Sequence, residues 1–432
     1  MSQAMLDTIA CRDCELQQVI PPLPPGGKAN CRRCKMTIAR NPIDPIDRPL
    51  ALAIAAAVVF LIANLMPLMG LSVAGRTAST TIIGGAYETW LRGSQATAVV
   101  VGFCAVVAPG CFIAFMLVVL SAARRPPAPR WIGRLLRMAS FVEPWSMSEV
   151  MLLGILVALI KIAQLATVTP GVGLYAVGLL VVLLAAIGST FDPHTIWQRV
   201  VWADGTSPRA LMPAAGGSAT RRGWKRFPHL DLASCSTCGL LSRPAAAGEV
   251  GHCPRCGASL EAHPQGSIQT TWALVIAAAI LYVPANALPV LTTTTLGSSE
   301  SDTIISGVIY LYQSGSWPLA LIVLVASVIV PLGKLAALAY LLITVQRGSA
   351  KNNHDRTRLY RLIEFVGRWS MLDVFVDAFI VALVQLSPLM SVAPGAGVVY
   401  FMAVVVLTMF AAHSFDQRLI WNARNPKQVL HG

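Results

Sequence analysis

Long apolar runs separated by short basic or polar segments dominate this sequence. Each run is about 20 residues or longer, the length that an α-helix needs to cross a bilayer. We predict eight membrane spans: residues 49–70, 97–123, 147–168 and 172–191 in the first half, and 271–292, 317–345, 370–388 and 395–413 in the second. The third and fourth runs of each half are separated by a Pro-Gly pair, which predicts two helical hairpins.

The two halves of the chain repeat each other. Asn286-x-x-Pro289 matches Asn64-x-x-Pro67 at an offset of 222 residues (286 minus 64), and Trp369-Ser370-Met371 matches residues 145–147 at an offset of 224 (369 minus 145). Chance does not hold an offset through so many identities, so the sequence indicates a tandem duplication. Each unit has an even number of predicted spans, so we expect the units to be parallel repeats.

Composition gives the class of protein. Of 432 residues, 55% are hydrophobic and 12% are charged, whereas a soluble domain has roughly a quarter charged residues. The net charge of +13 is placed in short blocks between the apolar runs, a pattern of membrane topology that argues against nucleic-acid binding. We therefore predict an all-α polytopic membrane protein built from two tandem four-helix units.

The basic residues also predict the orientation. Residues 1–48 are polar and lack the apolar segment of a signal peptide, so we expect the N-terminus to stay in the cytoplasm. With both termini inside, only Arg76 and Arg92 fall in outer loops, while Lys161 and Lys334 lie within spans. This distribution follows the positive-inside rule.

Ten cysteines are present, and eight of them form CxxC pairs. The two quartets are Cys11, Cys14, Cys31 and Cys34, and Cys235, Cys238, Cys253 and Cys256. Two CxxC turns can enclose one tetrahedral ion, so each quartet predicts a small zinc ribbon of rubredoxin-like form, here on the cytoplasmic side. Iron is the alternative metal and dithiol chemistry a third possibility. Either ribbon would serve as a docking or rigidifying module.

These signals divide the chain into six parts. We predict zinc ribbon 1 at 1–47, a first transmembrane unit at 48–200, a linker at 201–230, zinc ribbon 2 at 231–264, a second transmembrane unit at 265–424 and a tail at 425–432. Within the units, residues 130–147 and 355–371 alternate Arg with apolar residues. That pattern predicts connector helices in the inner headgroup layer.

One lysine stands out inside a predicted span. Lys334 lies about 10 residues from the end of its span, roughly 15 Å deep, where an unpaired cation costs at least ~2.5 kcal/mol. Asp373 is the expected partner, and Ser327, Ser370 and Thr408 could complete a polar cluster. Phe112 replaces the lysine in the first unit, so we expect any working site in the second. The alternative is a salt bridge that only fixes helix register.

Several motifs together resemble the paraquat-inducible protein A family over nearly the whole chain. They are the CxxC quartets before each unit, the Asn-x-x-Pro pairs, Phe365-Val-Gly-Arg-Trp-Ser-Met-Leu-Asp373, and Phe415-Asp416 with Trp421. The resemblance implies a bacterial inner-membrane protein, induced under stress, that works with an MCE-domain periplasmic partner on membrane phospholipids. It also implies an intramembrane polar region containing Lys334, Ser370 and Asp373, with Ser327 and Thr408 nearby.

The leading hypothesis is therefore lipid transfer to the periplasmic partner. The sequence contains no phosphate loop and no nucleophile–base constellation, so we do not expect an enzyme. Proton coupling through Lys334 and Asp373 remains open. The rival hypotheses are a scaffold that anchors the partner without carrying lipid, and a redox carrier with iron at the cysteines.

Overall fold

The fold is taken from a computed structural model of the chain. It describes residues 7–20, 23–73, 76–91, 93, 95–125, 129, 131–163, 167–199, 233–235, 237–242, 251–253, 255–260, 267–295, 298–315, 317–349, 351–383, 385–386 and 390–422. The predicted linker at 201–230 and the tail at 425–432 lie outside these residues.

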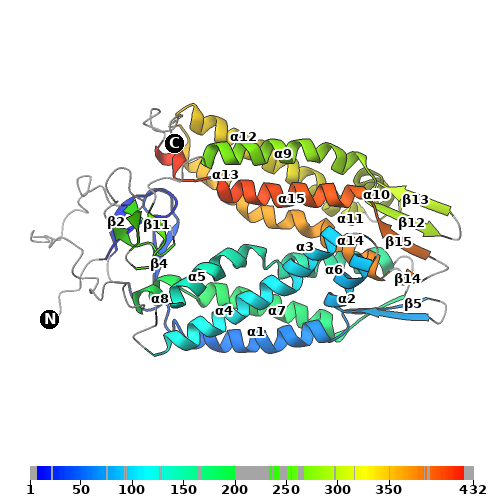
Figure 1. The fold of residues 1–432 in the computed structure, drawn as a ribbon, viewed down its shortest axis with the longest axis horizontal. Helices are drawn as coiled ribbons and strands as arrows, with labels where there is room; N and C mark the ends of the chain where they lie inside the picture. Colours follow the sequence, from blue (N-terminus) through cyan, green and yellow to red (C-terminus); the bar gives the residue numbers. More distant parts are fainter. Residues whose placement is uncertain are drawn as a thin grey trace, which may run out of the picture.

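Two helical units lie side by side, with the cysteine ribbons at one end and β-strands at the other (Figure 1). Within the described ranges, seven helical stretches are long and apolar enough to cross a membrane. They are Asp47–Leu65, Gln95–Ala123, Trp131–Ile160, Val172–Thr190, Ser267–Ala287, Ala320–Gln346 and Ala396–Ser414. The fold class is confirmed: a mostly helical, multi-pass membrane protein of two tandem units with two four-cysteine clusters.

The helices of each unit follow the same order. The first unit contains α1 (Asp47–Leu65), α2 (Ile82–Leu91), α3 (Gln95–Gly102), η1 (Phe103–Val107), α4 (Ala108–Ala123), α5 (Trp131–Val142), η2 (Glu143–Trp145), α6 (Ser148–Ala163), α7 (Val172–Thr190) and α8 (Pro193–Arg199). The second contains α9 (Ser267–Ala287), α10 (Ile304–Gln313), α11 (Trp317–Leu324), η4 (Val325–Ile329), α12 (Val330–Gln346), α13 (Asn353–Gly367), η5 (Arg368–Met371), α14 (Leu372–Leu383), α15 (Ala396–Ser414) and α16 (Leu419–Asn422).

The third span of the second unit is shorter than predicted. We expected a helix over 370–388, but α14 ends at Leu383 after 12 residues. Beyond it, β14 (Gln385–Leu386) and β15 (Met390–Pro394) pair in antiparallel register. The matching helix α6 likewise ends at Ala163 and is followed by β7 (Thr167–Pro170), where β-branched residues favour extended backbone.

Two antiparallel sheets form the end opposite the ribbons, and the hydrophobic pattern did not predict them (Figure 1). The first unit has the order β6-β5-β7, and the second has β13-β12-β15-β14. The remaining strands are β5 (Met69–Val73), β6 (Arg76–Thr80), β12 (Leu291–Thr295) and β13 (Ser298–Asp302). In each unit these strands join the end of the first long helix to the start of the last.

Gly171 and Gly395 allow the end of the first long helix of each unit to lie directly against the start of the last. A Cβ atom on Gly395 would lie 2.2 Å from the Pro289 carbonyl oxygen, and one on Gly171 would lie 2.2 Å from that of Pro67. The Gly395 N–H donates to Val290 O at 2.7 Å. The Pro-Gly pairs and the Asn-x-x-Pro motifs, which are far apart in the sequence, are thus two sides of one tight backbone contact.

The two units meet through their third helices. α6 packs against α14, and a Cβ atom on Gly154 would lie 2.8 Å from Phe375 Cβ. Buried side chains of both units, including Met151, Ile155 and Phe379, share one apolar cluster. The short helix α14 is therefore central to the inter-unit contact, and it also packs against α2 and α3 of the first unit.

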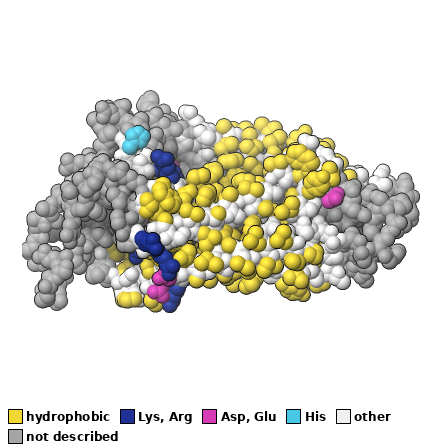
Figure 2. All heavy atoms as spheres, turned by 60° about the horizontal axis from the view of Figure 1, so that its bottom comes forward, with side chains coloured by type: hydrophobic (Ala, Val, Ile, Leu, Met, Phe, Trp, Pro, Cys, Tyr) yellow, Lys and Arg dark blue, Asp and Glu magenta, His cyan; other side chains and the backbone are white. Residues whose placement is uncertain are grey.

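An apolar belt surrounds the helices. Figure 2 shows hydrophobic side chains over the middle of the molecule, with Lys and Arg gathered toward the ribbon end in this view. Exposed apolar residues on the belt include Ile54, Val58, Leu61, Val182 and Ile280. Lipid would cover such a belt, because a soluble protein seldom exposes so large an apolar surface.

Candidate functional site

Each cysteine quartet comes together at the turns of two short hairpins. Ribbon 1 is residues 7–40, with strands β1 (Asp7–Ala10), β2 (Gln17–Ile20), β3 (Lys28–Asn30) and β4 (Thr37–Arg40). Ribbon 2 is residues 233–260, with β8 (Ala233–Ser234), β9 (Leu241–Ser242), β10 (Gly251–His252) and β11 (Ser259–Leu260). The ligand atoms within each quartet all lie within 4.8 Å of one another.

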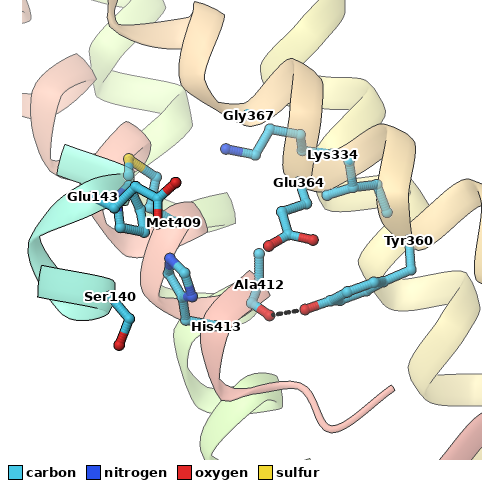
Figure 3. Close-up of a pocket in the computed structure, with 11 residues that line it drawn as sticks. Ser140, Glu143, Lys334, Tyr360, Glu364, Gly367, Met409, Ala412 and His413 are labelled. Atoms are coloured by element: carbon cyan, nitrogen blue, oxygen red, sulfur yellow. Dashed lines mark hydrogen bonds between the residues drawn. The ribbon is translucent and has the colours of Figure 1, made fainter. Parts of the chain in front are cut away.

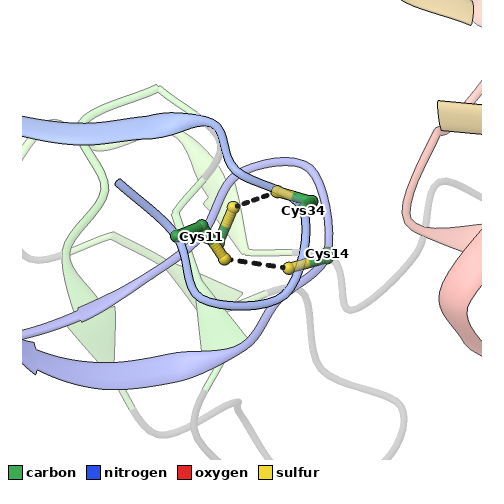
Figure 4. A group of neighbouring side chains, drawn as sticks. Cys11, Cys14 and Cys34 are labelled. Atoms are coloured by element: carbon green, nitrogen blue, oxygen red, sulfur yellow. Dashed lines mark hydrogen bonds between the residues drawn. The ribbon is translucent and has the colours of Figure 1, made fainter. Parts of the chain in front are cut away.

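The sulfur geometry fits a tetrahedral metal site. In ribbon 1, Cys11 Sγ lies 3.4 Å from Cys34 Sγ, and Cys14 Sγ lies 3.5 Å from Cys31 Sγ (Figure 4). In ribbon 2 the two matching distances are both 3.5 Å. Four sulfurs at ~2.3 Å from a zinc ion would lie about 3.8 Å apart. The predicted cysteines can therefore hold two metal ions.

Electrostatics gives the same conclusion. The hydrogen bond from the Cys14 thiol lowers the pKa of Cys11 to about 5, while burial raises the pKa of Cys34 to about 12. Four buried thiols this close cannot all ionise unless a cation compensates their charge. A bound divalent ion supplies that cation and keeps all four sulfurs as thiolates.

Ribbon 1 docks on the second unit. The Arg361 guanidinium on α13 donates to Asp13 Oδ2 at 2.6 Å and to the Cys34 carbonyl at 3.2 Å. The Arg33 guanidinium lies 5.4 Å from the ring centre of Trp421, which packs against the cysteine cluster. The buried ion pair of ribbon 1 is thus made with the unit farther from it in the sequence, while an exposed hydrogen bond from Arg40 to Ser189 O at 3.5 Å joins it to the first unit.

Ribbon 2 docks on the first unit through the matching residues. Arg137 on α5 donates to the Cys256 carbonyl at 2.7 Å, and Arg255 lies 5.9 Å from the ring centre of Trp197. Arg137 and Trp197 occupy the repeat positions of Arg361 and Trp421. The two ribbons have therefore exchanged units, and the same arginine–tryptophan pair receives each.

The predicted polar cluster lies where helices of the second unit converge. Lys334 on α12 is 3% exposed, and its Nζ donates to Thr408 Oγ1 on α15 at 2.9 Å. Ser327 Oγ donates to Asp373 Oδ2 on α14 and to Val323 O. The structure thus joins four of the predicted residues into two hydrogen-bonded pairs; the Lys334–Asp373 ion pair stays a prediction.

Ser370 is the fifth predicted residue, and it is buried in η5 beside the cluster. Within the described ranges, its Oγ has no hydrogen-bond partner. A buried hydroxyl without a partner costs free energy, so such groups tend to face a ligand or water.

The π-helical turn η4 contains Ser327 and positions its side chain. η4 precedes Pro331, and its wider turn accommodates a proline that cannot donate a backbone hydrogen bond. The first unit repeats this device in η1, before Pro109. There Ala105 replaces Ser327 and Phe112 replaces Lys334, so the duplicated scaffold carries the polar cluster only once.

A cavity of about 320 Å³ opens at Lys334 (Figure 3). Its lining includes Tyr360 and Glu364 from α13, His413 from α15, and Glu143 from η2 of the other unit. The matching cavity of the first unit has about 390 Å³, and apolar residues such as Phe112 and Phe191 line it together with the exposed charged residues Arg12, Arg137 and Glu143. Only one of the two cavities holds a buried cation.

Sequence reasoning did not find the rest of this cavity. A Cβ atom on Gly367 would lie 3.2 Å from Lys334 Nζ, so glycine is needed for the lysine to pass. Glu364 lies in the amphipathic connector and reads as an ordinary headgroup-facing residue. Glu143 comes from the other unit, and no local pattern indicates that contact. The Gly367-Arg-Trp-Ser run was the available signal.

The comparisons with known proteins agree with this architecture. The sequence model described as paraquat-inducible protein A matches residues 46–201 and again 268–425, one match for each unit. Intermembrane transport protein PqiA of Escherichia coli strain K12 is 35% identical over 423 residues, covering 97% of this chain and 96% of that protein.

Two more distant relatives cover the chain as fully. Lipophilic envelope-spanning tunnel protein A of the same strain is 29% identical over 96% of this chain and 91% of its own length. A probable intermembrane transport protein of Haemophilus influenzae is 29% identical over 96% of this chain and 95% of its own length. No solved structure matches the chain. The repeated match and the high coverage show that the chain belongs to the paraquat-inducible protein A family.

Proposed function

We propose that this chain is the inner-membrane subunit of an intermembrane phospholipid transport system and is not an enzyme. It accepts a lipid in the second unit and passes it to an MCE-domain partner in the periplasm. Both ribbons and both termini then lie in the cytoplasm, and the two sheets face the partner.

The observation that carries this proposal is the buried Lys334, which opens into a cavity of about 320 Å³. An intramembrane cation is costly, and such residues usually serve transport or ligand binding. The relatives named as intermembrane transport and envelope-spanning tunnel proteins supply the context for that role. Ser327, Ser370, Asp373 and Thr408 complete the proposed transport site.

The two cysteine quartets act as structural zinc sites in this proposal. A closed four-thiolate site leaves no open position for water or substrate, so it suits a structural role. Both quartets lie in ribbons that grip a membrane unit through arginine and tryptophan. The ions would keep the ribbons rigid enough to hold those contacts.

The test is lipid transfer from vesicles containing the full chain to a purified soluble MCE partner. Lys334→Ala and Asp373→Ala should abolish transfer while the protein remains inserted and folded. Lys351→Ala is the matched control, because Lys351 is an exposed lysine outside the site. Normal transfer by both site variants would refute the proposal and would favour the scaffold hypothesis, in which the chain only anchors its partner.

A further inference from the structure

The Lys334 cavity contains charges of both signs in a definite arrangement. The lysine is 3% exposed and closes the inner end, whereas Glu143, Glu364 and His413 are exposed at the mouth. Figure 3 shows the lysine amine and both glutamate carboxylates pointing toward one open space. The cavity therefore has a cationic inner end and an anionic mouth.

The inner end can accept a further anion. A lysine ammonium has three N–H donors, and the one hydrogen bond recorded for it among the described residues is to Thr408 Oγ1. A phosphate oxygen is a strong acceptor for the donors that remain on the ammonium.

The two carboxylates at the mouth favour a positively charged group on the ligand. Two carboxylates near a bound phosphate repel it, and like charges placed together at a binding surface oppose binding. A ligand with a primary ammonium a few bonds from its phosphate removes that repulsion and donates hydrogen bonds to the carboxylates. A ligand with a neutral glycerol or hydroxyl there does not.

We propose that this cavity binds a phosphoethanolamine headgroup, with the phosphate on Lys334 and the ammonium between Glu364 and Glu143. The inference rests on the proposed lipid-transport function and deepens it by naming the class of lipid, an aminophospholipid. The cavity of the first unit lacks the buried lysine, because Phe112 stands in place of Lys334 and Ser140 in place of Glu364; its two arginines, Arg12 and Arg137, are exposed.

The test is equilibrium binding to the purified full chain in detergent, measured by native mass spectrometry. The probes are dioctanoyl phosphatidylethanolamine, dioctanoyl phosphatidylglycerol and the chain-free glycerophosphoethanolamine. We expect the ethanolamine lipid to bind about tenfold more tightly than the glycerol lipid. The chain-free probe should compete only weakly, because it lacks the acyl chains that place a lipid at the cavity.

Substitutions separate the two ends of the cavity. Glu143→Gln with Glu364→Gln should remove the preference for ethanolamine while binding of the glycerol lipid is kept or strengthened. Lys334→Gln should weaken both lipids. Glu300→Gln is the matched control, because Glu300 lies on β13 at the opposite end of the molecule. Each variant should retain the thermal unfolding profile of the parent protein, so a loss of binding is not a loss of fold.

Equal binding of the two lipids by the parent protein would overturn the headgroup assignment. An ethanolamine preference that survives the double glutamate substitution would overturn it too. If the chain-free probe binds as tightly as the lipid, the ligand is a soluble phosphoethanolamine ester and the lipid assignment falls. Transfer to the MCE partner is measured separately, so transfer without headgroup preference would refute this inference and leave the proposed function standing.

Discussion

Arg361 donates two hydrogen bonds to Asp13 Oδ2, at 2.6 and 3.2 Å, although 348 residues separate them in the sequence. Asp13 is 2% exposed, and Gln417 donates to its other oxygen at 3.1 Å. This contact fixes the N-terminal ribbon to the C-terminal unit. Arg137 occupies the matching position in the first unit and contacts ribbon 2. Substitution of either arginine can therefore be compared with substitution of the other in the same protein.

Arg361→Ala should release ribbon 1 and leave ribbon 2 in place. Removing one partner of a buried, charged hydrogen bond costs about 1–3 kcal/mol, so local opening of ribbon 1 should rise about tenfold or more. Hydrogen exchange of the ribbon amides in the intact protein measures this. Arg137→Ala should give the reverse pattern, and Arg358→Ala, exposed on the same helix, should change neither ribbon. If Arg361→Ala increased hydrogen exchange equally in both ribbons, the docking of ribbon 1 on the second unit would be contradicted.

Metal removal should loosen the ribbons and spare the helices. We expect two zinc ions per chain by elemental analysis, and one after Cys34→Ser. A strong chelator should raise hydrogen exchange in ribbons 1 and 2, because metal binding supplies most of the folding free energy of such small domains. The helical signal in circular dichroism should stay unchanged. Iron in place of zinc would restore the redox hypothesis.

Gly367→Ala should displace the Lys334 amine without unfolding the protein. The new methyl group would lie 3.2 Å from Nζ and 3.4 Å from Cε, so the tip of Lys334 must move. Lipid transfer should fall, though less than in Lys334→Ala, because the flexible amine need shift by only a few tenths of an ångström. Gly333→Ala is the control, because a Cβ atom there meets nothing within 4 Å although it neighbours Lys334. The same loss of transfer in both variants would argue against a specific effect on the lysine.

Placing the first unit's Phe112 side chain at position 334, and the lysine at position 112, should distinguish the role of Lys334 in lipid transfer from its role in stability. Lys334→Phe copies the first unit and should abolish transfer while the thermal midpoint stays equal or rises, since a buried cation is not needed for packing. Phe112→Lys should destabilise the protein by at least ~2.5 kcal/mol, because it buries a new charge in the membrane. A marked fall in the midpoint of Lys334→Phe would favour the alternative in which the lysine only fixes helix register.

Gly395→Ala should be strongly destabilising. Its Cβ atom would overlap the Pro289 carbonyl oxygen, which is backbone and cannot rotate away. We expect a loss of ~2 kcal/mol or more, measured as a lower thermal midpoint in detergent. Gly307→Ala, where a Cβ atom meets nothing within 4 Å, should be nearly neutral. An unchanged thermal midpoint for Gly395→Ala would show that the backbone around Pro289 can shift at little cost in stability.

Local patterns predicted the parts of this protein that depend on local physics. Apolar runs fix helices, so α1 and α7 fall close to the expected ranges, and CxxC spacing fixes the two thiolate clusters. Lys334 and Thr408 were expected in one cluster because an intramembrane charge needs a partner. The helix and CxxC signals act over one helix or one turn, whereas the Lys334–Thr408 pairing followed from the charge cost of the buried lysine.

Long-range pairing was beyond the same reasoning. Strand β12 (Leu291–Thr295) pairs with β15, about 100 residues later, and a run of threonines reads equally well as a polar loop. The exchange of ribbons depends on side chains from opposite ends of the chain. Glu143 reaches the Lys334 cavity from the other unit, and the packing of the two units against each other brings it there.

The docking of ribbon 1 has a consequence for biosynthesis. Its receiving surface includes Arg361, Gln417 and Trp421, which leave the ribosome more than 300 residues after the ribbon itself. Ribbon 1 cannot make these contacts until synthesis has passed Trp421. Docking of ribbon 1 would therefore report that the second unit has been made, and a chain truncated before residue 361 would expose the docking surface of ribbon 1 to quality-control proteases.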